Sequence, residues 1–332
     1  MDLNPYNKRL LDDFYARDRR PTGVMIQVSA RCNLGCKMCG YVGRTPNIGF
    51  IDPALFSQIL EDCRSYGIHR ITMVTAWGEP MLHPGIFELL ELAQDFQIVL
   101  STNVTPLNRR RIERLSTLSI ALLQLSFCGF DRASYEGVYV GGNFDHVVEN
   151  LRLIQQIFSE RSPNTTLLVN GVSLRDDEDF VAKTVKFLKE IGFRDDQMEI
   201  KLPNNFGGLY AGSPTEPIRG LHTYKNLEGV SLDICTVLLD NPGIYIDGRV
   251  TACGCLDNSS ALIIGDIRKE TLREMRYGQR FEAMLQAFIA GDVSSIPLCR
   301  NCDVPYCNSR MVTYVSPATL SDPAAIDAAA QL

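Results

Sequence analysis

A nine-residue stretch, CNLGCKMCG, constrains this chain more than any other part of it. Cys32, Cys36 and Cys39 form a C-x3-C-x2-C pattern, so all three thiolates can reach one metal centre. A structural zinc site usually takes two ligands from a C-x2-C knuckle and two more from elsewhere. An iron–sulfur cube takes about one cysteine per iron, so three cysteines leave one iron open to a substrate. The spacing alone fits both a zinc knuckle and an open iron–sulfur cluster.

Composition narrows the class of protein. The chain has 332 residues, 45% of them hydrophobic, which is enough for a full-sized core. Its formal net charge of −6 argues against general nucleic-acid binding. We find no apolar run of membrane-spanning length and no basic-then-apolar leader, so we expect no membrane partner. Eleven cysteines without a secretion signal indicate metal ligands or reactive thiols in a reducing compartment. The composition therefore predicts a cytoplasmic metalloenzyme.

From residue 24 the hydrophobic pattern alternates between strand and helix periods. Strands are expected at 24–30, 70–76, 97–103, 121–127, 165–174 and 197–203. The intervening helices are expected from Asp52-Pro53 to about Gly67, from about Pro84, from Thr105-Pro106, over 144–158 and over 177–191. Six strand-then-helix units predict a parallel sheet with right-handed crossovers. The expected fold class is α/β, with a partial (β/α)6 barrel.

Polar clusters follow four of these expected strands. They are the cysteine stretch, Gly78-Glu79-Pro80, Ser101-Thr102-Asn103 and Ser126 to Gly129. Taken singly each has an ordinary explanation, since Gly-Glu-Pro forms turns and Ser-Thr-Asn caps helices. Ligands of parallel sheets, however, bind at the carboxyl ends of the strands. The four clusters together therefore predict one site on one rim.

The cysteine stretch followed by WGEPMLHP, STN and LSFCGFD resembles the radical S-adenosylmethionine (radical SAM) enzymes, whose core is a six-unit partial barrel. The resemblance runs over most of residues 24–200. It implies that Cys32, Cys36 and Cys39 hold a [4Fe–4S] cluster whose open iron chelates S-adenosylmethionine (SAM). The SAM-binding residues that it implies are Met38 near the adenine, Gly78 and Glu79 near the amino group, and Asn103 and Ser126 near the carboxylate and ribose.

Three positions depart from the pattern of the resembling enzymes. Trp77 stands where the first Gly of a Gly-Gly-Glu-Pro turn is common. Tyr139 lies about where many of these enzymes carry an Arg for the SAM carboxylate, and Cys128 replaces an Asp. None of the three is an expected cluster ligand.

After residue 203 a Gly/Pro-rich connector leads to a second group of cysteines. The layout over about residues 230–310 resembles the twitch domain, the short form of the SPASM extension. The resemblance implies one auxiliary [4Fe–4S] cluster held by Cys235, Cys253, Cys299 and Cys302, because no cysteine follows Cys307. A zinc ribbon is the alternative for this half. The expected division is an extension over 1–23, the core over 24–205, a connector over 206–229, the twitch domain over 230–315 and a tail over 316–332.

An open-iron cluster implies one-electron cleavage of SAM to a 5′-deoxyadenosyl radical that abstracts a substrate hydrogen. Resembling twitch enzymes include epimerases and dehydrogenases of aminoglycoside pathways. An epimerase needs an S–H donor on the opposite face of the carbon, whereas a dehydrogenase does not. Cys255 is the first candidate, because it lies two residues after Cys253 and shares its side in an extended segment. Cys128 is the second, Cys63 is expected in the core, and Cys307 is a spare thiol.

The favoured function is a radical SAM epimerase that inverts a carbinol carbon of an aminoglycoside or a related sugar or aminocyclitol. Dehydrogenation of such an alcohol is second and a peptide epimerase third. A non-catalytic iron–sulfur or zinc scaffold is the alternative from another class of protein. The expected partners are a sugar-like small molecule and an electron donor such as flavodoxin or ferredoxin, without nucleic acid.

Overall fold

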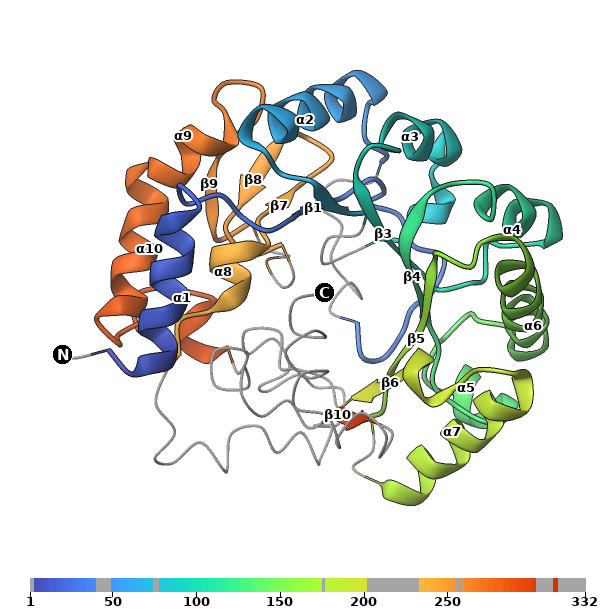
Figure 1. Cartoon of the computed structure of the whole chain (residues 1–332). Helices are drawn as coiled ribbons and strands as arrows, with labels where there is room; N and C mark the ends of the chain where they lie inside the picture. The colour runs from blue at the N-terminus through green and yellow to red at the C-terminus, as the bar shows by residue number, and fades with distance from the viewer. Residues whose placement is uncertain are drawn as a thin grey trace.

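The computed structural model describes residues 3–39, 49–73, 78–174, 177–201, 233–254, 257 and 260–302, and the backbone of 313–315. Its strands form a single sheet in the order β10-β6-β5-β4-β3-β2-β1-β7-β8-β9. The sheet curves around a central space, and helices α2, α3, α4 and α6 lie outside it (Figure 1). Among the described residues, no helix is both long and apolar enough to cross a membrane.

The central part of the sheet is the predicted partial barrel. Its strands are β1 (Val24–Ile26), β2 (Arg70–Thr72), β3 (Gln97–Thr102), β4 (Ile120–Ser126), β5 (Thr166–Val172) and β6 (Met198–Lys201). Each of these strands pairs in parallel with the next one along the chain. The parallel sheet of six strands expected from the hydrophobic pattern is thereby confirmed, and helices follow the first five strands.

Most helices of the barrel begin at a residue whose side chain caps them. They are α2 (Pro53–Tyr66), α3 (Ile86–Leu92), α4 (Arg109–Leu115), α5 (Arg132–Glu136), α6 (Phe144–Arg161) and α7 (Glu178–Ile191). Asp52 caps α2 by accepting from the main-chain N–H groups of Ala54 and Leu55, and Gly67 ends it with a φ of +75°. Both ends of α2 were predicted from these residues.

The predicted start of α4 was wrong. Thr105 and Pro106 were expected to begin it, but α4 begins at Arg109. The Asn108 side chain caps α4 by accepting from Arg111 N at 3.0 Å. Thr105 instead donates its N–H to Asn103 Oδ1 at 3.1 Å, which makes a turn before the helix. Helix α3 likewise begins at Ile86, two residues after the expected Pro84.

The C-terminal half adds to the same sheet. It contains α8 (Thr236–Asp240), β7 (Gly243–Ile244), β8 (Arg249–Thr251), β9 (Ile263–Asp266), α9 (Leu272–Tyr277), α10 (Gln279–Ile289) and β10 (Thr313–Val315). Strands β7 and β8 form an antiparallel hairpin. Strand β7 also pairs in parallel with β1, and β10 pairs antiparallel with β6. The C-terminal half therefore extends the barrel sheet at both of its edges.

The N-terminal helix α1 (Pro5–Ala16) lies beside α8 and α10 (Figure 1). The ring centroids of Phe14 and Phe281 are 6.1 Å apart, and Arg19 pairs with Glu282 at 2.6 Å. Asn7 Oδ1 accepts the Ile234 N–H at 2.9 Å. The first residues of the chain thus pack against the C-terminal cysteine region.

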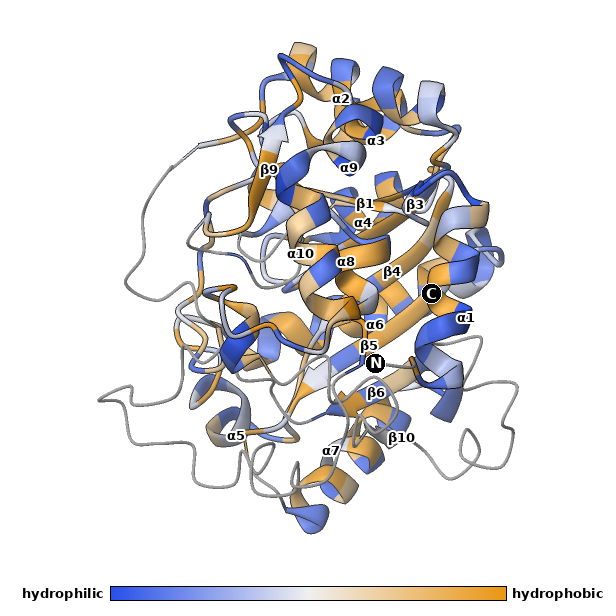
Figure 2. Cartoon of the chain, turned by 90° about the vertical axis from the view of Figure 1, so that its left-hand side faces the viewer, coloured by the Kyte–Doolittle hydropathy of each residue, from blue (hydrophilic) through white to orange (hydrophobic). Residues whose placement is uncertain are grey.

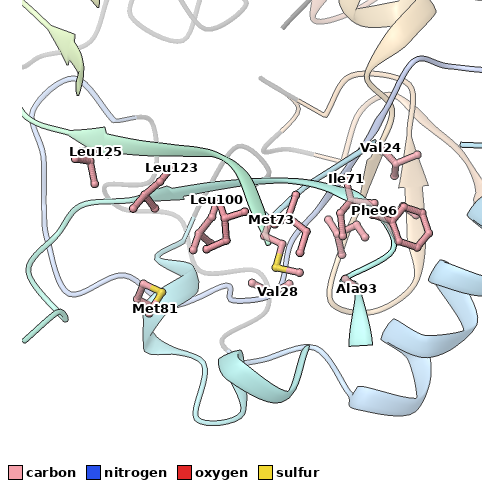
Figure 3. Close-up of a cluster of buried hydrophobic side chains, with 14 of the residues drawn as sticks. Val24, Val28, Ile71, Met73, Met81, Ala93, Phe96, Leu100, Leu123 and Leu125 are labelled. Carbon is pink, nitrogen blue, oxygen red and sulfur yellow. The ribbon is translucent and has the colours of Figure 1, made fainter. Parts of the chain in front are cut away.

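The core lies between the sheet and its helices. The strands are largely hydrophobic along their length (Figure 2). Side chains of the first four strands form one apolar layer with residues next to α3 and in the 3-10 turn η1 (Pro80–Leu82) (Figure 3). The layer includes Val24, Ile71, Met81, Ala93, Phe96, Leu100 and Leu123. This layer holds the carboxyl ends of β1, β2 and β3 in a fixed relation.

Candidate metal and cofactor site

The cysteine stretch leaves β1 and is held by main-chain hydrogen bonds to a distant segment. Gly35 N donates to Val140 O at 2.8 Å, and Lys37 N donates to Val138 O at 2.9 Å. Cys39 N closes a turn on Cys36 O at 3.0 Å. The backbone of the loop is thereby fixed before any side chain is considered.

The three thiols of this loop lie within electrostatic reach of one another. Burial, then the neighbouring Cys39 and Cys32 thiolates, raises the pKa of Cys36 to about 12. Burial also raises the pKa of Cys32. Gathering three such thiolates is costly without a compensating cation, and the iron of a cluster supplies it. The donor set therefore fits a [4Fe–4S] cluster.

Among the described residues, no three His, Cys, Asp or Glu side chains converge as they would on one ion. Thiolates on an iron–sulfur cube each bind a different iron, so a cube does not require such convergence.

The turn after β2 lies against the residues before Cys32. Gly78 has a φ of +115°, and a Cβ at this position would lie 1.9 Å from Ser29 O. Only glycine allows this close approach. Glu79 N donates to Arg31 O at 2.7 Å. The first and second rim segments therefore meet, as the sequence predicted.

Glu79 ties the second rim segment to the third. Its side chain is 2% exposed. One carboxylate oxygen accepts from Met81 N at 2.9 Å and Thr102 Oγ1 at 2.8 Å, and the other accepts from Asn103 N at 2.6 Å. Burial raises the pKa of Glu79 and these hydrogen bonds lower it, with a net increase to about 7. Three donors from the chain itself thus occupy most of the carboxylate, and its contact with the SAM amino group stays a prediction.

Asn103 ties the third rim segment to the cysteine loop. Its amide nitrogen lies 3.7 Å from Cys32 Sγ and 3.1 Å from Asn33 Oδ1. Its amide oxygen accepts from Thr105 N at 3.1 Å and from Thr105 Oγ1 at 2.6 Å. Asn33, Asn103 and Thr105 form a small network over the first expected cluster ligand.

The fourth rim segment is largely buried. Ser126, at the end of β4, and Met38, in the cysteine loop, are both half-buried. Cys128 is 2% exposed, and a Cβ added to Gly171 would lie 3.3 Å from the Cβ of Cys128. Burial raises the pKa of Cys128 to about 12, which keeps it a neutral thiol. Cys128 therefore packs within the core, while its predicted role and those of Ser126 and Met38 stay predictions.

Tyr139, where an Arg was expected from the resemblance, is a core residue. Its ring stacks on Tyr135 with centroids 4.8 Å apart and an interplanar angle of 11°. Neither hydroxyl has a hydrogen-bond partner among the described residues. Burial, then nearby Cys128 and Cys36, raises the pKa of Tyr139 well above its ordinary value.

The C-terminal cysteines surround the start of α8 and the end of β8. Cys235 is the N-cap residue of α8, and Cys299 begins the 3-10 turn η4 (Cys299–Asn301). Burial, with Cys235 nearby, raises the pKa of Cys299 to about 12. Cys302 is buried and Cys253 is half-buried directly after β8. Trp77, Cys255 and Cys307 lie outside the described residues.

The comparisons with known proteins agree with both halves of this arrangement. Residues 26–184 match the radical SAM superfamily. Residues 235–303 match the SPASM iron–sulfur cluster-binding domain. The chain is a radical SAM protein with a SPASM domain.

Curated relatives of this radical SAM protein are distant and match only in part. A GTP 3′,8-cyclase of Peptoclostridium acidaminophilum is 28% identical over 186 residues, which cover 54% of this chain and 56% of that protein. A tungsten-containing aldehyde ferredoxin oxidoreductase cofactor-modifying protein of Pyrococcus furiosus is 28% identical over 105 residues, 31% and 30% of the two chains. The chain thus spans less than two thirds of these relatives.

Solved structures share the fold over most of their length. BtrN in complex with AdoMet and 2-DOIA superposes with a TM-score of 0.59 at 18% identity, over 85% of this chain and 92% of BtrN. Streptococcus suis SuiB bound to the precursor peptide SuiA gives 0.65 at 14%, over 92% and 76%. Native anSMEcpe with bound AdoMet gives 0.59 at 15%, over 84% and 88%. At these identities the likeness establishes the fold alone.

The cofactors of this radical SAM protein are SAM and two [4Fe–4S] clusters, one for each half. The thiols of the N-terminal loop would hold the cluster that binds SAM. The second set would hold the auxiliary cluster. These ligand assignments follow the two cysteine patterns and stay predictions.

Two buried residues that organise the auxiliary half carry no sequence signal of their own. Arg276 has no exposed surface and donates to Leu238 O at 2.8 Å and Leu239 O at 2.5 Å, which closes the end of α8. Asp257 accepts from Thr251 Oγ1 and Leu262 N, both at 2.8 Å, and spans the loop that carries Cys253. In sequence they look like an exposed helix residue and a loop residue.

Proposed function

We propose that this radical SAM enzyme inverts a carbinol carbon of an aminoglycoside or related aminocyclitol. The observation that carries the proposal is the position of Gly254, the residue before Cys255. A Cβ added to Gly254 would lie 2.9 Å from Met25 Sδ, so the segment after β8 packs against β1. Strand β1 leads directly into the cysteine loop. Gly254 therefore lies beside the first strand of the barrel, and the proposal assigns the donor role to the cysteine that follows it.

The chain's own residues orient the reacting groups. When bound, the N-terminal cluster supplies the electron that cleaves SAM. Glu79 and Asn103 hold three rim segments together around that site. Glu79 would also present a carboxylate to the SAM amino group, because an ammonium needs an acceptor. An electron donor such as flavodoxin or ferredoxin would reduce the cluster.

Inversion requires a hydrogen atom from the opposite face of the substrate carbon. Once a hydrogen atom has been removed from one face with the help of bound SAM, the Cys255 S–H would return a hydrogen atom to the other face, forming a C–H bond and leaving a sulfur radical on Cys255. One electron, supplied by the external electron donor and relayed by the auxiliary cluster that the C-terminal cysteines would hold, and one proton from solvent would then restore the thiol. Cys128 is the second candidate, but its burial leaves almost no exposed surface for substrate.

The test uses a panel of aminoglycosides and free aminocyclitols in heavy water. The expected result is deuterium at the inverted carbon, because a thiol exchanges its hydrogen with solvent. Cys255→Ala should still form 5′-deoxyadenosine but no inverted product. Cys63→Ala, which removes a thiol buried in α2, is the matched control and should retain inversion. Inversion that survives Cys255→Ala and disappears in Cys128→Ala would move the donor role to Cys128.

Dehydrogenation is the second candidate, because the auxiliary cluster expected in the SPASM domain could accept the electron of the substrate radical. It would give a ketone without solvent deuterium, and Cys255→Ala would leave its rate unchanged if that residue only lines the site. A peptide epimerase is the third candidate. Turnover of peptides with no turnover of any aminocyclitol in the panel would contradict the proposed substrate class.

A further inference from the structure

We propose that Asn103 is a positioning residue that donates an N–H···S hydrogen bond to Cys32 and thereby raises the reduction potential of the N-terminal cluster. The proposal rests on the radical SAM assignment and on Cys32 as a cluster ligand. It does not depend on which reaction follows SAM cleavage.

The orientation of the Asn103 amide is fixed by its partners. Its nitrogen lies 3.7 Å from Cys32 Sγ, within hydrogen-bonding distance for sulfur. Its oxygen accepts from both the N–H and the hydroxyl of Thr105. If the amide were rotated by half a turn, its NH₂ group would face the Thr105 N–H, so two donors would meet. Its oxygen would face the Cys32 thiolate, so two acceptors would meet. The network therefore directs a donor at the sulfur.

The amide has no capacity left for another ligand. Its second N–H is used by Asn33 Oδ1 at 3.1 Å. Its oxygen already accepts two hydrogen bonds from Thr105. An amide offers two donors and about two acceptor positions, and all are occupied here. The predicted SAM contact of Asn103 would require breaking one of these bonds, whereas the bond to Cys32 requires none.

The turn that carries Asn103 is strained and over-determined. Val104 has a φ of +69°, which is a genuine outlier for a β-branched residue. The buried carboxylate of Glu79 holds Asn103 N on one side at 2.6 Å. On the other side, Asn150 Nδ2 donates to Val104 O at 3.3 Å and Leu107 O at 3.0 Å. Strain kept in place by surrounding bonds indicates a functional constraint, and here it presents the Asn103 amide to Cys32.

The effect on the cluster follows from charge. Reduction adds one negative charge to the cluster and its sulfur ligands, so a donor to sulfur stabilises the reduced state more than the oxidised one. Hydrogen bonds to the sulfurs are among the factors that set these potentials. Removing the donor should make the N-terminal cluster harder to reduce.

The test is a redox titration of the reconstituted holoenzyme, followed by electron paramagnetic resonance, with the auxiliary cluster as internal reference. In Asn103→Leu, which removes the donor without adding charge, the reduced-to-oxidised ratio at a fixed potential should fall about threefold to tenfold. A tenfold fall corresponds to a shift of about 59 mV for one electron. Asn103→Asp has the same shape but adds a charge, so its shift should have the same sign and be larger.

Asn108→Leu is the matched control. It makes the same substitution as Asn103→Leu at the Asn that caps α4, and the Asn108 side chain bonds to Arg111 N rather than to Cys32 or to the turn at Val104. The reduction potential of its N-terminal cluster should equal that of the unaltered protein. An equal downward shift in Asn108→Leu, or no shift in either Asn103 variant, would overturn the proposal. If Asn103→Leu fails to assemble a cluster, Asn103→Ala serves in its place, and the same outcomes decide.

Discussion

At the scale of single residues, a buried polar group at the rim is hydrogen-bonded, whereas two buried hydroxyls in the core have no partner among the described residues. Glu79 has three donors from its own chain around a fully buried carboxylate. Tyr135 and Tyr139 bury hydroxyls that have no partner among the described residues. A bonded buried group fixes local structure, whereas an unbonded one costs stability. The two kinds of buried group should therefore have different, measurable effects on the free energy of unfolding.

Glu79 should make the stability of the cluster-free protein fall as pH rises. Burial raises its pKa from 4.5 to about 7, so the folded state keeps a proton that the unfolded state loses. The free energy of unfolding should therefore decrease between about pH 4.5 and pH 7, by about 3 kcal/mol from this group, and level off above. Urea unfolding of Glu79→Gln should lack this part of the slope. Parallel pH profiles for the two proteins would contradict the raised pKa.

Tyr139→Phe should stabilise the protein, because it removes a buried hydroxyl without a partner. The expected gain in unfolding free energy is about 1 kcal/mol. Tyr245 is the matched control, since its buried hydroxyl donates to the main-chain oxygen of Asp257. Tyr245→Phe should lose about 1 kcal/mol in the same urea titration. Equal losses in both variants would mean that the Tyr139 hydroxyl is bonded after all.

At the scale of elements, α1 links the start of the chain to the auxiliary half. Its Asn7 accepts from Ile234 N, directly before Cys235, and its Phe14 packs on Phe281 of α10. Arg276 lies over both rings, with its guanidinium 5.0 Å and 4.0 Å from the Phe14 and Phe281 centroids. Helix α1 therefore supports α8, and Cys235 lies at the N-terminus of α8.

Phe14→Ala should loosen the auxiliary half before the barrel. Truncating this fully buried ring should cost about 3–5 kcal/mol. We expect the reconstituted variant to retain about four iron instead of about eight, with the N-terminal cluster intact by electron paramagnetic resonance. Tyr15→Ala changes the adjacent residue, which is 43% exposed, and should leave the iron content unchanged. Equal loss of both clusters in Phe14→Ala would contradict this local role.

At the scale of the whole molecule, one continuous sheet connects the two cysteine sets. Met25 of β1 pairs with Gly243 of β7, and β7 continues through its hairpin to the segment of Cys253. Strand β1 leads in the other direction to Cys32. The segments that carry the two cysteine sets are thereby joined by the main-chain hydrogen bonds of one sheet.

Two separate cysteine sets should bind two separate clusters. Iron and sulfide analysis of anaerobically reconstituted protein should approach about eight of each per chain. A triple alanine variant of Cys32, Cys36 and Cys39 should retain about half. Zinc in place of iron, or one cluster in total, would contradict these ligand sets.

Local signals in the sequence were sufficient for the elements of the barrel. Asp52 and Gly67 marked the two ends of α2, because a cap acts within a few residues of itself. The alternation of hydrophobic periods predicted six strand-then-helix units, because each period reports the face that an element buries. The Thr105 signal failed because Asn103 engages the Thr105 N–H in a turn that begins before the helix.

By itself, the sequence determined the barrel, the two cysteine sets and the meeting of the first three polar segments at one rim. Only the tertiary structure decided how those parts are joined. The pairing of β1 with β7, the packing of Phe14 on Phe281 and the bond from Asn103 to Cys32 connect residues far apart in the chain. Such contacts leave no local period or cap, because each forms only after the intervening elements have folded and placed both partners.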